Sequence, residues 1–153
     1  MSQLDSTDMA ILGYLQENGK RSYSEIARYL ECSEGTIRSR INKMLSAGVF
    51  EFIIHTNPNK VGLEVQAIIG FSTRLGAQED IARSLQKHPE VRFVGAFSGK
   101  HDLIIQAYFK SNEDLVNFVN KELAKIEGIL NADVNVELKQ YKDSFSYIQA
   151  ENS

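Results

Sequence analysis

Residues 1–48 repeat apolar side chains at the three- and four-residue spacing of amphipathic helices. This pattern predicts helices within residues 5–19, 22–30 and 33–48. A serine that can cap a helix starts each of the last two segments, and the first of these serines opens a Ser-x-x-Glu capping box. These local signals predict a helical N-terminal domain.

After Gly48 the apolar period changes to two, the alternation of a half-buried strand. Strands are expected over residues 49–56, 65–75, 91–98, 103–109 and 129–141, and helices over residues 77–87 and from Ser111 onward. The first strand would link two domains, at residues 1–60 and 61–153. The order that follows is β-α-β-β-α-β, so the fold class is α+β with a ferredoxin-like second domain.

The second and third predicted helices are separated only by the short turn Glu31-Cys32, and the outer face of the third is small, polar and basic. Small residues let a helix backbone approach base edges, and long donors reach guanine and phosphates. We therefore predict a helix-turn-helix that binds double-stranded DNA. Its candidate contacts are Arg21, Ser33, Glu34, Gly35, Thr36, Arg38, Ser39, Arg40 and Lys43.

Within this set, Thr36, Arg38 and Ser39 are expected nearest the bases with Gly35, whereas Arg40 and Lys43 suit phosphates. Arg21 would assist from the preceding loop. The same charges could instead be the solvated face of an ordinary helical hairpin.

The net charge of −3 is unusual for a DNA-binding protein. Residues 1–60 hold seven Lys or Arg and seven Asp or Glu, so this half is neutral rather than basic. Affinity would then depend on local charges and on presenting two or more copies to DNA, which favours a homo-oligomer.

The predicted sheet carries apolar residues on both faces, although helices of this fold cover only one. In residues 91–98, Phe93 and Phe97 alternate with Val94 and Ala96. We interpret the uncovered face as a homodimer interface and assign Val94 to it.

Compartment and chemistry are constrained by what the sequence lacks. Apolar runs are far shorter than a membrane span, and residues 1–5 do not resemble a signal peptide. A single cysteine fits the reducing cytoplasm. The three histidines are far apart, so we expect no metal, no cofactor and no enzymatic activity.

The whole chain resembles the Lrp/AsnC, or feast/famine, family of transcriptional regulators. The matching residues are Leu4-Asp5, Asp8, Ile11-Leu12, Ser24-Glu25-Ile26-Ala27, residues 33–41, Ala47-Gly48-Val49, Asn57-Pro58, Leu63 and Gly99-x-x-Asp102. The resemblance implies a winged helix-turn-helix followed by an ACT-like (RAM) domain. It also implies dimers that assemble further, often to octamers, with amino-acid effectors bound between dimers.

The effector site that the resemblance implies comprises Gly99, Lys100, His101, Asp102, Leu130 and Asn131. We predict that Asp102 meets the ammonium group of a bound amino acid, directly or through water. From the residues alone, Gly99 and Asp102 are also explained by an ordinary hairpin turn. Many family members carry an acidic or aromatic pair where this chain has Lys100-His101, which favours a ligand with an acidic or amide side chain.

The predicted function is therefore a sequence-specific transcriptional regulator that responds to an amino acid or related small molecule. One alternative is a nucleoid-type architectural protein that binds DNA with little sequence specificity. Another is an amino-acid-sensing regulatory subunit of an enzyme.

Overall fold

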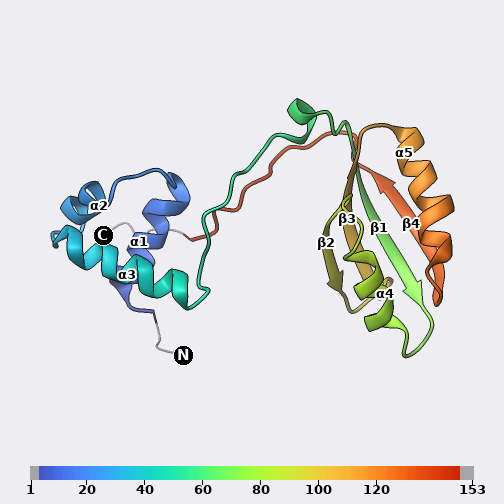
Figure 1. Ribbon diagram of the computed structural model, residues 1–153, viewed down its shortest axis with the longest axis horizontal. Helices are drawn as coiled ribbons and strands as arrows, with labels where there is room; N and C mark the ends of the chain where they lie inside the picture. The colour runs from blue at the N-terminus through green and yellow to red at the C-terminus, as the bar shows by residue number, and fades with distance from the viewer. Residues whose placement is uncertain (1–3, 149–153) are drawn as a thin grey trace. The chain divides into compact units, whose positions relative to one another are not determined.

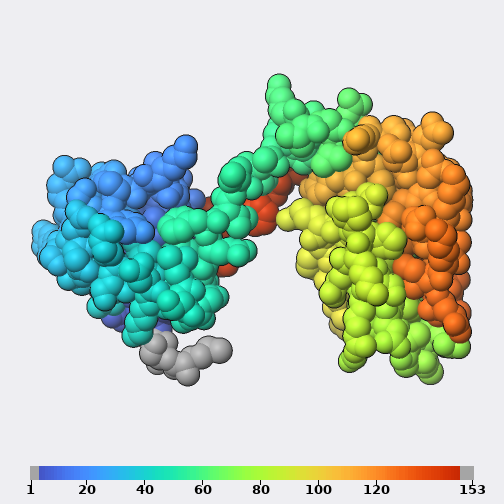
Figure 2. All heavy atoms as spheres, in the orientation of Figure 1, coloured from blue at the N-terminus to red at the C-terminus, as the bar shows by residue number. Residues whose placement is uncertain are grey.

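The computed structural model describes residues 4–148, and the chain forms two compact units (Figures 1 and 2). Residues 4–54 and 141–148 make up the first unit, and residues 55–140 make up the second. Residues 141–148, which the sequence placed in the second domain, thus pack with the first unit.

The first unit is built from α1 (Ser6–Glu17), α2 (Tyr23–Tyr29) and α3 (Glu34–Ser46). Asp5, Ser22 and Ser33 cap the three helices through their side chains, as local sequence predicted for the two serines. Each helix turns its apolar stripe inward, and the core consists of Ile11, Leu12, Leu15, Ile26, Ala27, Ile37, Ile41 and Met44. The predicted helices are confirmed.

The predicted linker strand over residues 49–56 is wrong, because that segment follows an irregular course. An isolated strand has no partner for its backbone amides and carbonyls, so alternation alone does not make one. Among the described residues of the first unit no strand is present, so the wing that the resemblance implied is not seen.

The C-terminal segment is held on α1 by the side-chain amide of Gln16. Its Nε2 donates to the Phe145 carbonyl oxygen at 3.1 Å, and its Oε1 accepts from the Ile148 amide at 2.9 Å. Ile148 packs, half-buried, against the helical core. Residues 141–148 therefore belong to the first unit although they follow the second unit in sequence.

Gln16→Ala should lower the stability of the first unit modestly. Each of its two hydrogen bonds contributes about 0.5–1.5 kcal/mol, and both are partly solvated. The measurement is the urea midpoint followed by far-ultraviolet circular dichroism, with Gln86→Ala in the other unit as the matched control. An unchanged midpoint would show that Gln16 does not hold the segment.

The second unit is a four-stranded antiparallel sheet within the described residues, in the order β2-β3-β1-β4 (Figure 1). Its elements follow the ferredoxin-like order. They are η1 (Pro58–Val61), β1 (Val65–Thr73), α4 (Gln78–Leu85), β2 (Val91–Ala96), β3 (Leu103–Phe109), α5 (Asn112–Asn117), η2 (Phe118–Glu122), η3 (Leu123–Lys125) and β4 (Ile129–Val136). The last strand ends five residues before the predicted Tyr141, where its pairing with β1 stops.

Both helices cover the same face of this sheet. Ile81 of α4 and Leu115 of α5 join a core that contains Ile69, Phe71 and Ile105 from the strands. The opposite face carries Ile68, Gly70, Phe93, Gly95, Ile104 and Tyr108. Each of them either alternates with core residues along its own strand or pairs with a residue that does.

The face assigned to Val94 from the sequence is wrong. Val94 pairs with buried Ile105 and packs against the helix-covered core. The register of β2 shifts between Val91 and Phe93, so Val91 also joins that core whereas Phe93 lies on the open face. A bulge of this kind cannot be read from alternation, which assumes an unbroken period of two.

The part of the open face formed by β2 is apolar and aromatic. Phe93 and Phe97 are 45% and 46% exposed, and their rings lie edge-on with centroids 6.3 Å apart. Both rings cover Gly95, where an added Cβ would lie 2.6 Å from the Phe93 ring and 2.8 Å from the Phe97 ring.

None of the helices in the part of the chain that the structure describes has the length and apolar character needed to cross a membrane.

Candidate DNA-binding and effector sites

The start of α3 is compact and locally capped. The Ser33 hydroxyl accepts from the Thr36 amide at 3.0 Å and shares a hydrogen bond with the Thr36 hydroxyl at 2.8 Å. At Gly35 an added Cβ would come no closer than 3.7 Å to Ser33 Oγ, so the first turn is open on its outer side. Ser39 is exposed on the same side, one turn further on. This surface offers small side chains and the amide end of a helix to a ligand outside the unit.

The Arg38 side chain projects from the outer face of α3 toward α2. Its Nη2 lies 2.7 Å from Glu34 Oε1, one turn earlier on the same helix. Its guanidinium carbon also lies 5.2 Å from the centre of the Tyr23 ring. The side chain is nevertheless 58% exposed. Arg38 is thus held by one carboxylate and one aromatic face while open to solvent.

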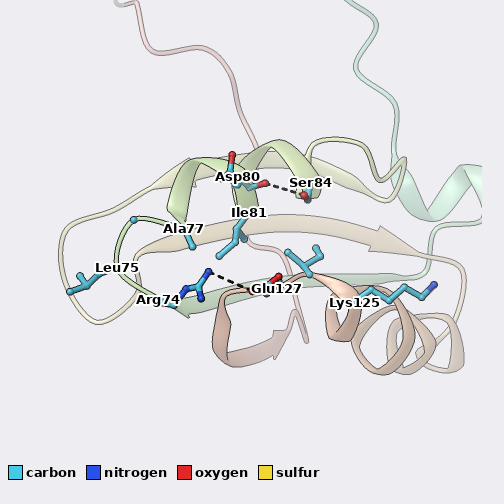
Figure 3. Close-up of a pocket in the computed structure, with 10 residues that line it drawn as sticks. Arg74, Leu75, Ala77, Asp80, Ile81, Ser84, Lys125 and Glu127 are labelled. Atoms are coloured by element: carbon cyan, nitrogen blue, oxygen red, sulfur yellow. Dashed lines mark hydrogen bonds and ion pairs between the residues drawn. The ribbon is translucent and has the colours of Figure 1, made fainter.

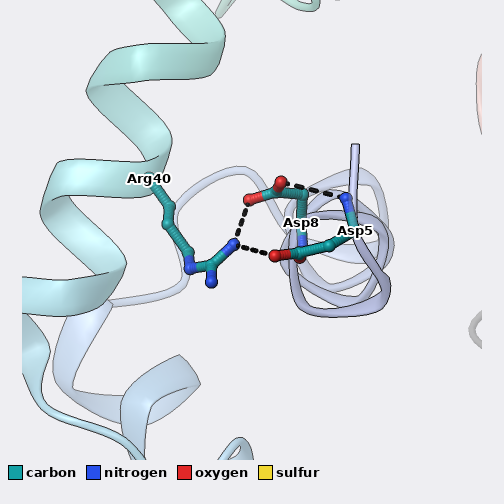
Figure 4. Close-up of polar contacts among 3 residues, drawn as sticks. All are labelled: Asp5, Asp8 and Arg40. Atoms are coloured by element: carbon teal, nitrogen blue, oxygen red, sulfur yellow. Dashed lines mark hydrogen bonds and ion pairs between the residues drawn. The ribbon is translucent and has the colours of Figure 1, made fainter. Parts of the chain in front are cut away.

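Arg40 leaves α3 on the other side and joins it to α1 (Figure 4). Its Nη1 donates to Asp5 Oδ2 at 2.7 Å and to Asp8 Oδ1 at 2.8 Å. The two carboxylates raise the pKa of Arg40 above its usual value. Hydrogen bonds from the Asp8 amide and then from Arg40 lower the pKa of Asp5. The predicted phosphate contact of Arg40 would have to compete with this ion pair.

A hollow of about 660 Å³ lies along this side of α3. It is lined by Asp5, Asp8, Ser33, Gly35, Thr36, Ser39, Arg40 and Lys43. Lys43 is exposed and forms no ion pair with the described residues, in contrast to Arg21, Arg38 and Arg40. It is therefore the predicted donor that is most available to a phosphate.

Arg21 lies between α1 and α2 and is largely enclosed by them. Its Nη2 lies 2.9 Å from Glu17 Oε2, and its guanidinium packs over the stacked rings of Tyr14 and Tyr29 at 5.1 and 5.7 Å. The side chain is only 15% exposed. These contacts join α1 to α2 and hold the guanidinium within the unit.

In the second unit, Asp102 ties the loop between β2 and β3 to the end of β1. Its Oδ2 accepts from the Thr73 amide at 2.7 Å and from the Thr73 hydroxyl at 3.1 Å. The Asp102 backbone donates to the Phe71 carbonyl and accepts from Gln78 Nε2, both at 2.8 Å. The sequence suggested an ammonium ligand or a turn residue, whereas the observed partners belong to a neighbouring strand and to α4.

Lys100 and His101 reach across the open sheet face to Asp133 of β4. Lys100 Nζ lies 3.0 Å and His101 Nε2 lies 3.4 Å from Asp133 Oδ2. The hydrogen bond from Lys100, followed by one from Asn131, lowers the pKa of Asp133. The His101 ring lies over Gly70, where an added Cβ would be 2.5 Å from it. Asp133 was not among the residues predicted from the sequence, although its alternation with Asn131 places a polar pair on one strand face.

The remaining predicted effector residues surround the same loop edge. Gly99 is exposed with a φ of 137°, which residues with a side chain rarely adopt. Leu130 is 70% exposed, and Asn131 Nδ2 donates to Asp133 Oδ1 at 3.2 Å. The structure thus brings Lys100, His101 and Asn131 together around Asp133, while Leu130 points away into solvent.

A pocket of about 480 Å³ on the helix-covered side was not predicted (Figure 3). It is lined by Arg74, Leu75, Gly76, Ala77, Asp80, Ile81, Ser84, Lys125, Ile126 and Glu127. Arg74 and Glu127 face each other across it at 3.7 Å. Its residues come from the β1–α4 loop and α4 on one side and from the end of η3 and the loop after it on the other, which are far apart in sequence. No cluster of three or more potential metal ligands occurs within residues 4–148.

Both units match known families. Residues 4–45 match the AsnC-type helix-turn-helix domain, and residues 66–147 match the Lrp/AsnC ligand binding domain. An uncharacterized HTH-type transcriptional regulator of Pyrococcus furiosus is 40% identical over 134 residues, covering 87% of this chain and 90% of the relative. The HTH-type transcriptional regulator FL11 of the same organism is 30% identical, covering 92% and 93%.

Solved structures agree with these matches. The L-Met complex of a transcriptional regulator from Neisseria meningitidis has a TM-score of 0.87 at 33% identity, covering 94% of this chain and 96% of that one. AsnC of E. coli has a TM-score of 0.86 at 23% identity, covering 92% and 96%, and this likeness concerns the fold alone.

Proposed function

Because the chain belongs to the Lrp/AsnC family of transcriptional regulators, with a helix-turn-helix DNA-binding domain and a ligand-binding domain, we propose that it binds specific DNA sequences in response to an amino acid or related small molecule. Such a protein would act in the cytoplasm and would catalyse no reaction. The observation that carries the DNA-binding proposal is the outer face of α3, which is small, capped and flanked by exposed donors.

The predicted contact residues are proposed to have different roles according to their surroundings: some contact bases, one contacts a phosphate, and others hold the helices together. Gly35, Thr36 and Ser39 would lie nearest the bases, with Arg38 reading an edge from the side of α2 and Lys43 meeting a phosphate. Ser33 and Glu34 begin this surface. Arg40 and Arg21 have strong intramolecular partners, so their proposed role is to hold the three helices together.

We propose that the protein acts as a homodimer or a larger homo-oligomer, with the open sheet face between copies. The DNA-binding half has no excess positive charge, so one copy would gain little from phosphates. The rings of Phe93 and Phe97 on the open face supply the apolar area that a self-complementary contact needs.

The effector is proposed to bind beside the loop of residues 99–102. The Neisseria relative was solved with L-Met, which makes an amino acid the first class to test. Lys100 can meet a carboxylate and Asp133 an ammonium, because exchanging their mutual ion pair for a zwitterion keeps both charges compensated.

Arg38→Ala should weaken binding to a preferred duplex by about 1–3 kcal/mol and relax its preference at one base position. Binding would be measured by fluorescence anisotropy with the duplex recovered by in vitro selection from a randomised library. Arg28→Ala, on the exposed side of α2, removes the same charge and serves as control. A uniform loss across unrelated duplexes would instead make Arg38 a phosphate contact.

A further inference from the structure

We infer that Tyr23 and Glu34 determine DNA specificity by positioning the Arg38 guanidinium, Tyr23 as a fixed platform and Glu34 as a filter against phosphate contacts. This inference rests on the proposed function, since it concerns how a DNA-reading residue is presented. It assigns a role to Tyr23, which is absent from the contacts predicted from sequence.

Tyr23 is suited to be a platform because its own ring is fixed. It is the first residue of α2, directly after the Ser22 cap, and it packs half-buried against the helical core. The Arg38 guanidinium carbon lies 5.2 Å from the ring centre, within the range of a cation–π contact. A long side chain that would otherwise sample many rotamers is thereby held at the edge of α3 before DNA arrives, which lowers the entropy lost on binding.

Glu34 supplies the selective element. Its Oε1 lies 2.7 Å from Arg38 Nη2, so the pair is nearly neutral in the free protein. A phosphate that approaches Arg38 must also approach the Glu34 carboxylate, and the two anions repel each other. Guanine presents neutral acceptors, N7 and O6, so it can bind the guanidinium with a smaller penalty. Glu34 therefore disfavours a non-specific contact more than a specific one.

The contrast with Arg40 supports this division of roles. Arg40 donates to two carboxylates from α1 and is held against them. Arg38 has one carboxylate on its own helix and one ring face, and it remains 58% exposed. One arginine of α3 is therefore fixed in place, while the other is oriented but free to exchange its partner.

The test compares two duplexes, one recovered by in vitro selection with the wild-type protein and one of equal length with the same bases shuffled. Tyr23→Leu should weaken binding to the selected duplex about two- to fivefold and leave the shuffled duplex unaffected. Tyr23→Phe keeps the ring and should bind like the wild type. Glu34→Gln should tighten binding to the shuffled duplex and steepen the dependence of log K on log salt by about 0.9, since Arg38 becomes free to neutralise one more phosphate.

The same substitutions in an Arg38→Ala background separate positioning from folding. If Tyr23 and Glu34 act through Arg38, Tyr23→Leu should not weaken DNA binding further once Arg38 is absent. Glu34→Gln should then neither steepen the salt dependence nor change the ratio of the affinities for the selected and the shuffled duplex, although the loss of its charge can tighten both equally. Losses that persist in that background, or a Tyr23→Phe variant as weak as Tyr23→Leu, would overturn the inference while leaving the proposed function intact. A wild-type protein that enriches no sequence would overturn the proposed function and this inference with it.

Discussion

Replacing Phe93 with Asp is expected to separate the protein into monomers while both units remain folded. If the open sheet face meets a second copy, the new carboxylate becomes buried there without a partner, at a cost of about 3–5 kcal/mol per buried charge. A two-fold interface contains the substitution twice, which doubles the effect. Sedimentation velocity across a range of concentrations would measure the change in mass.

The position of Phe93 makes this substitution selective. Its ring is 45% exposed and covers Gly95 rather than a core residue, so its removal leaves the helix-covered side of the sheet unchanged. An oligomer of unaltered size and stability in the variant would exclude this face as the interface.

Val94→Asp is the matched control, one residue away on the other face of β2. Val94 packs against the core beneath the helices, so an aspartate there should unfold the second unit rather than only dissociate it. Far-ultraviolet circular dichroism distinguishes the two results. A folded monomer from Val94→Asp would contradict the assignment of faces given by the strand register.

Local signals predicted most of the helices because they depend on neighbouring residues. Ser22 and Ser33 accept hydrogen bonds from amides three residues later, which fixes the start of a helix without reference to the rest of the fold. The ferredoxin-like order was predictable for a similar reason, since each strand in residues 65–109 alternates over a length close to that observed.

The errors occur where structure depends on a distant partner. Residues 49–56 alternate as a strand does, but no described strand pairs with them. The bulge between Val91 and Phe93 reverses the face of the residues before it, because its origin lies in pairing with β3. A strand pattern in the sequence describes one strand, whereas the formation of a strand also depends on the partner with which it pairs.

The candidate sites show the same limit for charged residues. Arg38 and Arg40 are nearly equivalent in sequence, two residues apart on one helix. Arg40 has its partners on α1, and Asp5 lies 35 residues away in the chain. Sequence periodicity gives the direction of a side chain but not what it meets, so a structural ion pair and a DNA contact cannot be told apart in advance.

Substitution of Asp102 is also expected to have a large effect, and two different substitutions separate the possible roles of its carboxylate. Asp102→Ala removes the acceptor for both the amide and the hydroxyl of Thr73 and should lower the free energy of unfolding of the second unit by about 1–3 kcal/mol. Asp102→Asn keeps an oxygen that can accept from the Thr73 amide, so its stability should stay close to that of the wild type. Thermal unfolding without added ligand would measure this difference.

Amino acids added to the same variants would then test the effector contact. A ligand at one hundred times its Kd stabilises the native state by about 2.7 kcal/mol, so the wild type should show a clear rise in melting temperature with its effector among the standard amino acids. Since the Asp102 carboxylate is already occupied by Thr73, Asp102→Asn should retain most of that rise, whereas Lys100→Met should lose it. If Asp102→Asn melted normally but no longer responded, the carboxylate itself would meet the ligand's ammonium, as the sequence first indicated, and Thr73 would share its acceptor with the effector.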